Sequence, residues 1–383
     1  MLKPGKLQEE AMGVRAWTIR ISCALALGAA ALAGPAAAMD GIGHGPPGGG
    51  SGGGGGAPPV GFGQFYASLR SALLDDSRVL RDAVLGRSHD AVAGHETGGW
   101  IGAHDASAGA ATAGLATVKG DRTNVIGGFD TQRAGWRLGF AAGGGAARWR
   151  ASAVGSDAVI DGWHSALWTG RSLGPVRLAL GAGYSHSDVV AHRVDSLGGA
   201  YRGGFSANVS QAFGEASLPL RAGPVRTEPY AQAAWVGLRA KGFVETGGAN
   251  PITGSGANQD VGYGDLGLRL GLGGGVIRPY ADLSWRHAWG DLNPVLNGQI
   301  AGSGGGVAMS EGVGGVGSGG GSGDPSLGGA IADAGRPVRA DSGTVKAGFS
   351  APLGRARLNL GYDGVFARGV KDQGVALRVS MRF

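Results

Sequence analysis

The residues of this chain that could carry out catalysis are grouped most densely in one short polar segment. Ser185, His186, Ser187 and Asp188 follow one another, and these are the residue types of a serine nucleophile, its base and an orienting acid. The alternative interpretation, which we favour, is the polar end of a strand beside a long loop. The chain contains no Walker A phosphate-binding loop. We therefore expect no catalytic residues and no enzyme activity.

Metal chemistry is weakly supported as well. None of the eight histidines pairs with another at the spacing of a helical metal site. The only cysteine, Cys23, lies in a segment that we expect to be removed, so thiolate sites and disulfides are excluded from the mature chain. The formal charge is +6, but the basic residues are scattered, which argues against a nucleic-acid surface. We expect no metal, no cofactor and no nucleic-acid partner.

Residues 1–38 have the features of a secretory signal peptide. Four basic residues precede the apolar run 21–33, and small residues follow as far as Ala38, where we expect cleavage. The apolar run is too short to span a bilayer, which needs about 20 such residues. The intact signal predicts that nothing is missing upstream and that the chain is handed to the Sec translocon.

Two further segments precede the strands. Residues 39–63 are dominated by Gly and Pro and cannot bury a core, so we expect a linker or a vestigial passenger there. Residues 64–90 are predicted to comprise a helix at 64–87, followed by a short linker. The helix would be about 36 Å long, and it carries too many charges to face lipid. Its apolar residues recur at spacings of four or seven, as Phe65, Leu69, Leu73, Leu80 and Val84.

Residues 91–383 are predicted to form alternating strands, and the final one, 371–383, is the clearest. Leu377 lies on an apolar face and Arg378 on a polar face, because side chains alternate along a strand. The chain then stops at Phe383 with no polar tail. Such a strand suits a closed membrane barrel, whose last strand pairs with its first, near Trp100, and leaves no edge.

About twelve strands of this kind are predicted, an even number, with short turns alternating with long loops as in outer-membrane barrels. A Gly-rich loop insertion is expected at 298–335. A soluble sandwich is the alternative, but it would not need strands of twelve to sixteen residues. We expect interfacial aromatic girdles, made by Trp100, Trp136, Trp163, Trp235, Trp285 and Trp289. The strands are placed near 98–106, 121–131, 134–148, 158–171, 175–190, 202–219, 224–240, 259–272, 275–290, 340–353, 355–367 and 371–383.

The order and spacing of several motifs in residues 98–383 resemble the translocator domain of autotransporters, the barrel of type V secretion. The motifs are Gly99-Trp100-Ile101-Gly102, Gly135-Trp136-Arg137-Leu138-Gly139, Pro229-Tyr230-Ala231, Gly242-Phe243-Val244-Glu245-Thr246-Gly247-Gly248, Leu266-Gly267-Leu268-Arg269, Trp285-Arg286-His287-Ala288-Trp289-Gly290-Asp291 and the terminal Arg382-Phe383. The resemblance implies an all-β membrane protein: an antiparallel transmembrane β-barrel of about 12 strands with an N-terminal helix in its pore. It also implies that the barrel assembly machinery recognises the strand ending in Phe383. The resemblance does not imply a passenger enzyme for this chain, because only residues 39–63 lie between the predicted signal peptide and the helix.

These observations predict a monomeric translocator barrel in the outer membrane of a Gram-negative bacterium, embedded in outer-membrane lipid with its long loops extracellular. It would export or display an N-terminal segment. The alternative is a stand-alone channel or adhesion barrel that acts through its long loops. An enzyme at the barrel rim is a third hypothesis.

Overall fold

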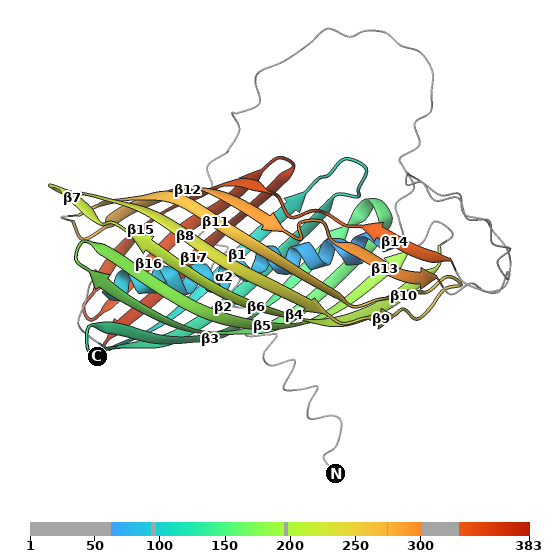
Figure 1. Cartoon of the computed structure of the whole chain (residues 1–383), viewed down its shortest axis with the longest axis horizontal. Coiled ribbons are helices and arrows are strands. Elements are labelled where there is room, and N and C mark those ends of the chain that lie inside the picture. The colour runs from blue at the N-terminus through green and yellow to red at the C-terminus, as the bar shows by residue number, and fades with distance from the viewer. Residues whose placement is uncertain (1–62, 93–96, 195–197, 274, 301–328) are drawn as a thin grey trace, which may run out of the picture. The chain divides into compact units, whose positions relative to one another are not determined.

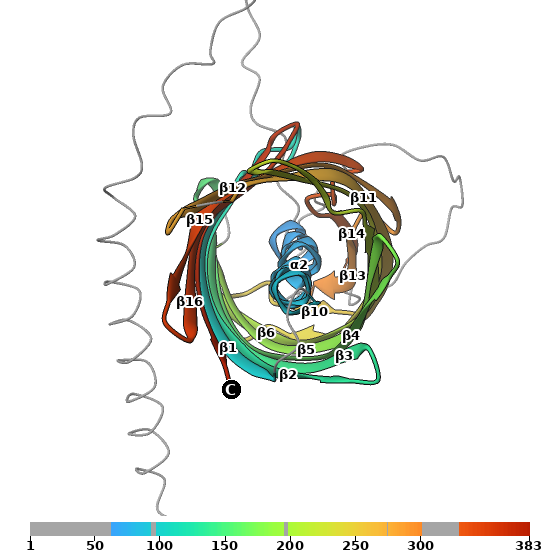
Figure 2. The ribbon, with the colours of Figure 1, turned by 90° about the vertical axis from the view of Figure 1, so that its left-hand side faces the viewer.

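The computed structural model describes residues 63–92, 97–194, 198–273, 275–300 and 329–383. Within them, a single antiparallel sheet closes into a twelve-stranded barrel around helix α2 (Gln64–Val92), as Figures 1 and 2 show. The predicted fold class is confirmed. The predicted signal 1–38 and all but the last residue of 39–63 lie outside the described residues.

Each predicted strand is present, with ends that differ by a few residues. The wall consists of β1 (Gly98–Ala110), β2 (Val118–Arg133), β3 (Trp136–Ala151), β4 (Ser156–Leu173), β5 (Val176–Val194), β6 (Ala200–Ser217), β8 (Val225–Ala240), β11 (Ala257–Leu272), β12 (Arg278–Gly290), β15 (Asp341–Leu353), β16 (Ala356–Ala367) and β17 (Val370–Arg382). A three-residue strand, β7 (Leu220–Ala222), makes a hairpin with the start of β8.

The barrel closes where the last strand meets the first, as predicted. Trp100 on β1 lies opposite Ser380 on β17, and the pairing continues over the whole length of β1. At its end the Phe383 N–H donates to the Thr97 carbonyl at 3.0 Å. Closure matters because a backbone polar group left unpaired in lipid costs several kcal/mol.

The alternation of side chains gives the wall a lipid face and a lumen face. Leu138 and Phe140 are about half exposed on the outside of β3, whereas Arg137 between such positions is buried inside. Five of the six predicted girdle tryptophans are exposed on the outer face, at 38–52%. The prediction for Trp100 is wrong. Its neighbour Ile101 takes the outward position and Trp100, only 5% exposed, points into the lumen.

The two ends of the barrel differ in their connections. One, here called the turn end, carries the short turns, such as 133–136 and 353–356, together with the start of β1 and the end of β17. The other, the loop end, carries the longer connections, of which 290–341 is the longest. Helix α2 begins at the loop end, where its first residues contact these connections, and ends at the turn end.

Helix α2 is five residues longer than predicted and passes through the lumen (Figure 2). Leu69, Leu80 and Val84, from the predicted apolar set, are at most 1% exposed, because they pack inside the barrel wall. Within the described residues no helix is long and apolar enough to cross a membrane.

A second, smaller sheet lies at the loop end and is called the mouth sheet here. It consists of β9 (Phe243–Val244), β10 (Ile252–Gly254), β13 (Val295–Ile300) and β14 (Ala330–Ala334), in the order β14-β13-β10-β9. Its strands come from the connections 240–257 and 290–341, and β13 and β14 contact α2. The predicted insertion 298–335 therefore begins and ends in paired strands, and its residues 301–328 lie outside the described part of the chain.

Candidate functional site

The candidate site is the lumen itself, because α2 brings four arginines into it. Arg70, Arg78, Arg81 and Arg87 are each 1–5% exposed. A buried charge is costly unless it is paired and hydrogen-bonded. The groups that satisfy these arginines are side chains on the inner faces of the wall strands and, for Arg70, backbone carbonyls at the mouth sheet.

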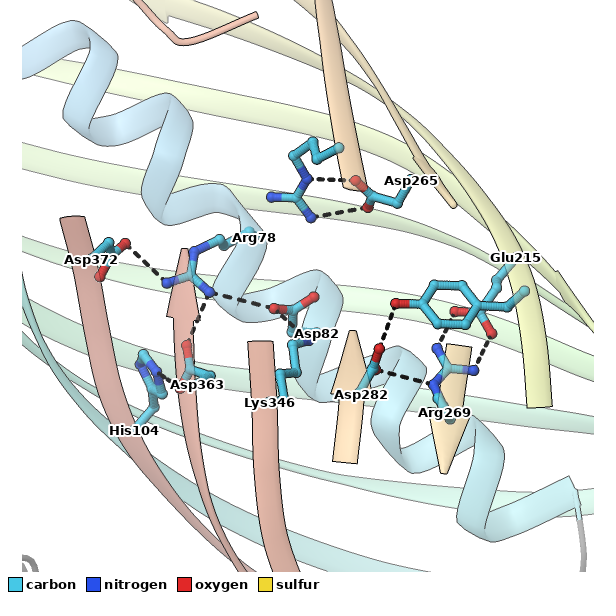
Figure 3. A network of polar contacts seen from close by, with 12 residues as sticks. Arg78, Asp82, His104, Glu215, Asp265, Arg269, Asp282, Lys346, Asp363 and Asp372 are labelled. Carbon is cyan, nitrogen blue, oxygen red and sulfur yellow. Dashed lines mark hydrogen bonds and ion pairs between the residues drawn. The ribbon is translucent and has the colours of Figure 1, made fainter. Parts of the chain in front are cut away.

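Arg78 is the centre of the network in the middle of the lumen (Figure 3). Its Nη1 lies 3.1 Å from Asp363 Oδ2 on β16, and its Nη2 lies 2.9 Å from Asp372 Oδ2 on β17. Asp82, one turn further along α2, is 3.6 Å from Nη1 and 3.0 Å from Lys346 Nζ on β15. One helix face is thus joined by charge to the last three strands of the barrel.

The wall strands carry further pairs around this centre. Arg122 on β2 donates to the Asp372 carboxylate and lies 3.2 Å from Asp76 on α2. Arg286 on β12 makes a bidentate pair with Asp265 on β11, at 2.6 and 3.0 Å. Two parallel hydrogen bonds in such a pair fix geometry as well as charge.

At the turn end, the last turns of α2 are held by acidic residues of the wall. Arg87 Nη2 donates to Asp130 Oδ1 at 3.0 Å, and the same oxygen accepts from Arg137 at 2.6 Å. His89 lies with Nε2 3.0 Å from Glu215 Oε1 and Nδ1 3.2 Å from Glu228 Oε1.

His89, Glu215 and Glu228 are close enough to be metal ligands, with ligand atoms within 4.8 Å of one another. However, Arg269 Nη1 lies 2.8 Å from Glu215 Oε1 and 3.3 Å from Glu228 Oε1. The guanidinium already supplies positive charge to the oxygens that a metal ion would use. These three groups are a structural ion cluster, and histidine spacing could not reveal it because the glutamates lie on β6 and β8.

At the loop end, Glu245 joins the first turn of α2 to the mouth. Tyr66 Oη donates to Glu245 Oε1 at 2.9 Å, and the Tyr66 ring stacks on Phe243 with centroids 4.2 Å apart. Arg193 on β5 lies 2.7 Å from Glu245 Oε2, which also accepts from the Ile252 N–H at 2.9 Å. Glu245 is 2% exposed, and its two oxygens are satisfied from three directions.

The mouth sheet and its connections also accept hydrogen bonds from α2. Arg70 donates to the carbonyls of Val295 and Ser255, both at 2.8 Å. Ser71 Oγ donates to the Arg336 carbonyl at 2.6 Å. Where the helix begins, the Gly63 N–H donates to Asp333 at 2.6 Å. The helix is therefore held at its start, middle and end.

The polar segment singled out for catalysis is divided between the two faces of β5. Ser185 is buried on the lumen side, with Oγ 2.8 Å from His164 Nδ1, and His164 Nε2 is 3.1 Å from Asn124 Oδ1. His186 and Asp188 lie on the other face, 3.6 Å apart. Ser185 lines neither of the two main cavities formed by the described residues. Ser185 and His186 therefore point to opposite faces of the wall, and the imidazole in contact with Ser185 is that of His164 on β4, which lies outside the segment.

Comparison with known proteins agrees with this geometry. A protein-family model described as the autotransporter β-domain matches residues 97–332. An extracellular serine protease of Serratia marcescens is 27% identical over 348 residues, which cover 84% of this chain but 30% of the relative. A second extracellular serine protease of that organism is 27% identical over 260 residues, 60% of this chain and 24% of the relative. The chain thus spans less than a third of the length of these relatives.

Solved structures show the same fold. The translocator domain of the autotransporter NalP from Neisseria meningitidis has a TM-score of 0.59 at 12% identity, covering 80% of this chain and 98% of that one. The β-domain of the Bordetella autotransporter BrkA has a TM-score of 0.52 at 14% identity, covering 75% of this chain and 100% of that one.

Proposed function

The chain belongs to the autotransporter β-domain family, and we propose that its barrel exports the residues N-terminal to α2 and then displays them at the cell surface. One observation carries this proposal. Helix α2 enters the lumen at the loop end, where Gly63 is bonded to Asp333 on β14, and reaches the turn end before β1 begins. Residues before Gly63 would therefore leave the barrel on the side of the long loops.

The fold is that of an outer-membrane translocator barrel of Gram-negative bacteria. The orientation that we propose puts the loop end outside the cell and the turn end in the periplasm, as is usual for outer-membrane barrels. Outer-membrane lipid then contacts the apolar outer face. The Sec translocon delivers the chain, and the barrel assembly machinery inserts it by way of β17 and Phe383. The barrel works as a monomer.

The segment proposed for display is 39–63, whose last residue, Gly63, is bonded to Asp333 at the mouth. The serine protease activity named for the relatives is not transferred, because this chain spans only 30% and 24% of their lengths. A stand-alone channel is a weaker alternative, because α2 runs through the lumen and is bonded to both of its ends. An adhesion barrel acting through its long loops remains the competing function.

Surface display can be tested with an epitope tag placed at Gly53. We expect antibody to label whole cells and protease shaving to release the tag. A matched tag in the turn 353–356 should be labelled only after permeabilisation. A third tag, near Ser318, tests the longest connection and should be labelled on whole cells. Labelling of the turn but not of Gly53 on intact cells would contradict export of the N-terminal segment.

The role of α2 as a pore plug can be tested by deleting 64–87. We expect single-channel conductance in planar bilayers to rise, since the deletion removes the side chains that fill the lumen. A large conductance in the intact protein that the deletion does not change would favour the channel alternative.

A further inference from the structure

The outer surface of the barrel at the turn end combines arginines with exposed apolar side chains. This surface follows β16, β17, β1, β2, β3 and β4, which are neighbours in that order in the sheet and lie side by side in Figure 2. We call it the seam arc, and it comprises the turns 353–356 and 133–136, the C-terminus and the end of β4. Its arginines, each exposed or half-buried, are Arg133, Arg171, Arg355 and Arg382.

The apolar side chains of the seam arc point away from the barrel. Phe129 is 65%, Leu353 59% and Phe383 69% exposed. The rings of Phe129 and Phe383 approach the same residue, Gly99, where a Cβ would lie 3.2 and 3.4 Å from them. They therefore form one apolar patch across β17, β1 and β2. Outward apolar residues of a membrane barrel lie in the lipid, so the seam arc lies where the barrel wall leaves the hydrocarbon.

Two of the arginines lie beside a tryptophan of the girdle. Arg171 has its guanidinium carbon 5.2 Å from the centroid of the Trp136 ring, within the range of a cation–π contact. Arg133 pairs in register with Trp136 across the turn between β2 and β3. Tryptophan prefers the boundary between hydrocarbon and head groups, and arginine extends its stem along apolar surface to bring its charge out of it. Both guanidinium groups are thus at the level of the head groups, where they meet lipid as well as water.

The charge of the seam arc is of one sign. The segments 131–137, 171–178, 352–358 and 379–383 contain no aspartate or glutamate. Asp130, next to the first segment, is buried on the inner face and pairs with Arg87 and Arg137. Among the described residues, the negative charge on the outer side of this arc is therefore that of the chain terminus.

The outer face at the loop end is different, because its exposed charges have both signs. Asp157 and Asp341 are exposed there. Arg150 pairs in register with Asp157, and Arg239 Nη1 lies 3.0 Å from Asp260 Oδ1. A surface of one sign is thus a property of the seam arc and is not shared by the opposite end of the wall.

We propose that the seam arc binds the head groups of anionic phospholipids, with its apolar residues among the acyl chains and its arginines on the phosphates. From β16 to β4 there are five gaps between strands, about 24 Å at about 4.8 Å each. That spread is too wide for one small anion and suits a row of lipids. An anionic leaflet attracts basic residues at its surface, and guanidinium groups match phosphate oxygens in a bidentate way. This contact requires only that the turn end lies at a lipid surface, so it can fail while the proposed export function holds.

The test uses the full chain, folded in a zwitterionic detergent, and native mass spectrometry with phosphatidylglycerol and phosphatidylcholine titrated separately. We expect the apparent dissociation constant to be at least about fivefold lower for phosphatidylglycerol, since one basic residue at an anionic surface is worth about that factor. High salt should reduce this preference, because it screens exposed charges. The test variant should abolish it and combines Arg133→Gln, Arg171→Gln, Arg355→Gln and Arg382→Gln.

The matched control removes the same number of exposed cations from the loop end and should keep the preference. It combines Lys119→Gln, Arg148→Gln, Arg150→Gln and Arg202→Gln. Heat-modifiable gel mobility verifies that each variant is folded. If the fourfold variant of the seam arc misfolds, Arg133→Gln with Arg171→Gln tests the part beside Trp136 and should still lower the preference about twofold or more.

Three results would overturn the proposal: equal affinity of the native protein for the two lipids, an equal loss in the control, or a preference that survives in the seam-arc variant. A fourth concerns a different partner. A lower yield of folded barrel in cells, from a variant whose lipid preference is unchanged, would assign the seam arc to a protein and would also overturn it.

Discussion

Arg78 on α2 and Asp372 on β17 lie with their Nη2 and Oδ2 atoms 2.9 Å apart, and both residues are at most 6% exposed. The pair joins the pore helix to the strand that closes the barrel against β1. Asp372 also accepts from Arg122 on β2, so three elements meet at one carboxylate. The seam of the barrel and the position of the helix are thus stabilised by the same charges.

We expect Arg78→Met to loosen the helix in the lumen. The change leaves the buried carboxylates of Asp363 and Asp372 short of one cation, and removing one partner of a buried pair typically costs about 3–5 kcal/mol. Planar bilayer recordings should show more frequent opening events. The double variant Arg78→Met with Asp372→Leu should be milder, because it leaves less uncompensated charge. Equal behaviour of Arg78→Met and the native protein would show that this pair does not hold the plug.

Glu245 should control the mouth. Glu245→Ala removes the acceptor of Tyr66, Arg193 and the Ile252 N–H, and leaves the Arg193 charge buried. Hydrogen exchange in the first two turns of α2 should speed up by at least about tenfold, which corresponds to 1.4 kcal/mol. Tyr66→Phe serves as the graded comparison. It removes one hydrogen bond, worth about 1 kcal/mol, and keeps the stacking on Phe243. Equal exchange in both variants would contradict a central role for the carboxylate.

Close packing of the mouth on the helix can be tested at Gly335. A Cβ there would lie 2.4 Å from the backbone carbon of Ala67 and 2.5 Å from the Ser68 nitrogen, too close for either chain to remain in place. We expect Gly335→Ala to detach β14 from the start of α2, with protease cleavage near Gly63 as the measurement. Gly329→Ala is the matched control, since a Cβ there meets nothing within 4 Å. Resistance of both variants to cleavage would show that this contact is dispensable.

The barrel could be predicted from the sequence because the alternation of side chains is a local property. Residues such as Leu377 and Arg378 show their faces without knowledge of their partners. The same rule predicts that Trp100 points inward if its neighbour Ile101 points outward. Trp100 was assigned to a girdle only because it is aromatic. The helix was found from its apolar spacing, and its charges indicated a polar lumen.

The interior contacts could not be predicted in the same way. Arg78 and Asp372 are 294 positions apart in the sequence, and their contact depends on the position of α2 along the barrel axis. The mouth sheet was missed for a different reason. Its strands β9 and β10 are two and three residues long, too short to show a period. The Gly-rich composition around β13 and β14 concealed the others.

The faces of the closing strand give the last prediction. Leu377→Arg puts a charge on the outer face of β17, at a cost of about 2–4 kcal/mol near the bilayer midplane. Arg378→Ser acts on the lumen face, where the side chain comes close to Gly86 of α2, and should affect assembly much less. The measurement is the yield of folded barrel in outer membranes, from the gel mobility of unheated and boiled samples. Deleting Phe383, or adding a charged tail after it, should also lower the yield, because its N–H completes the seam with Thr97. Equal tolerance of the Leu377 and Arg378 changes would contradict the assigned faces, and with them the placement of β17 in the membrane wall.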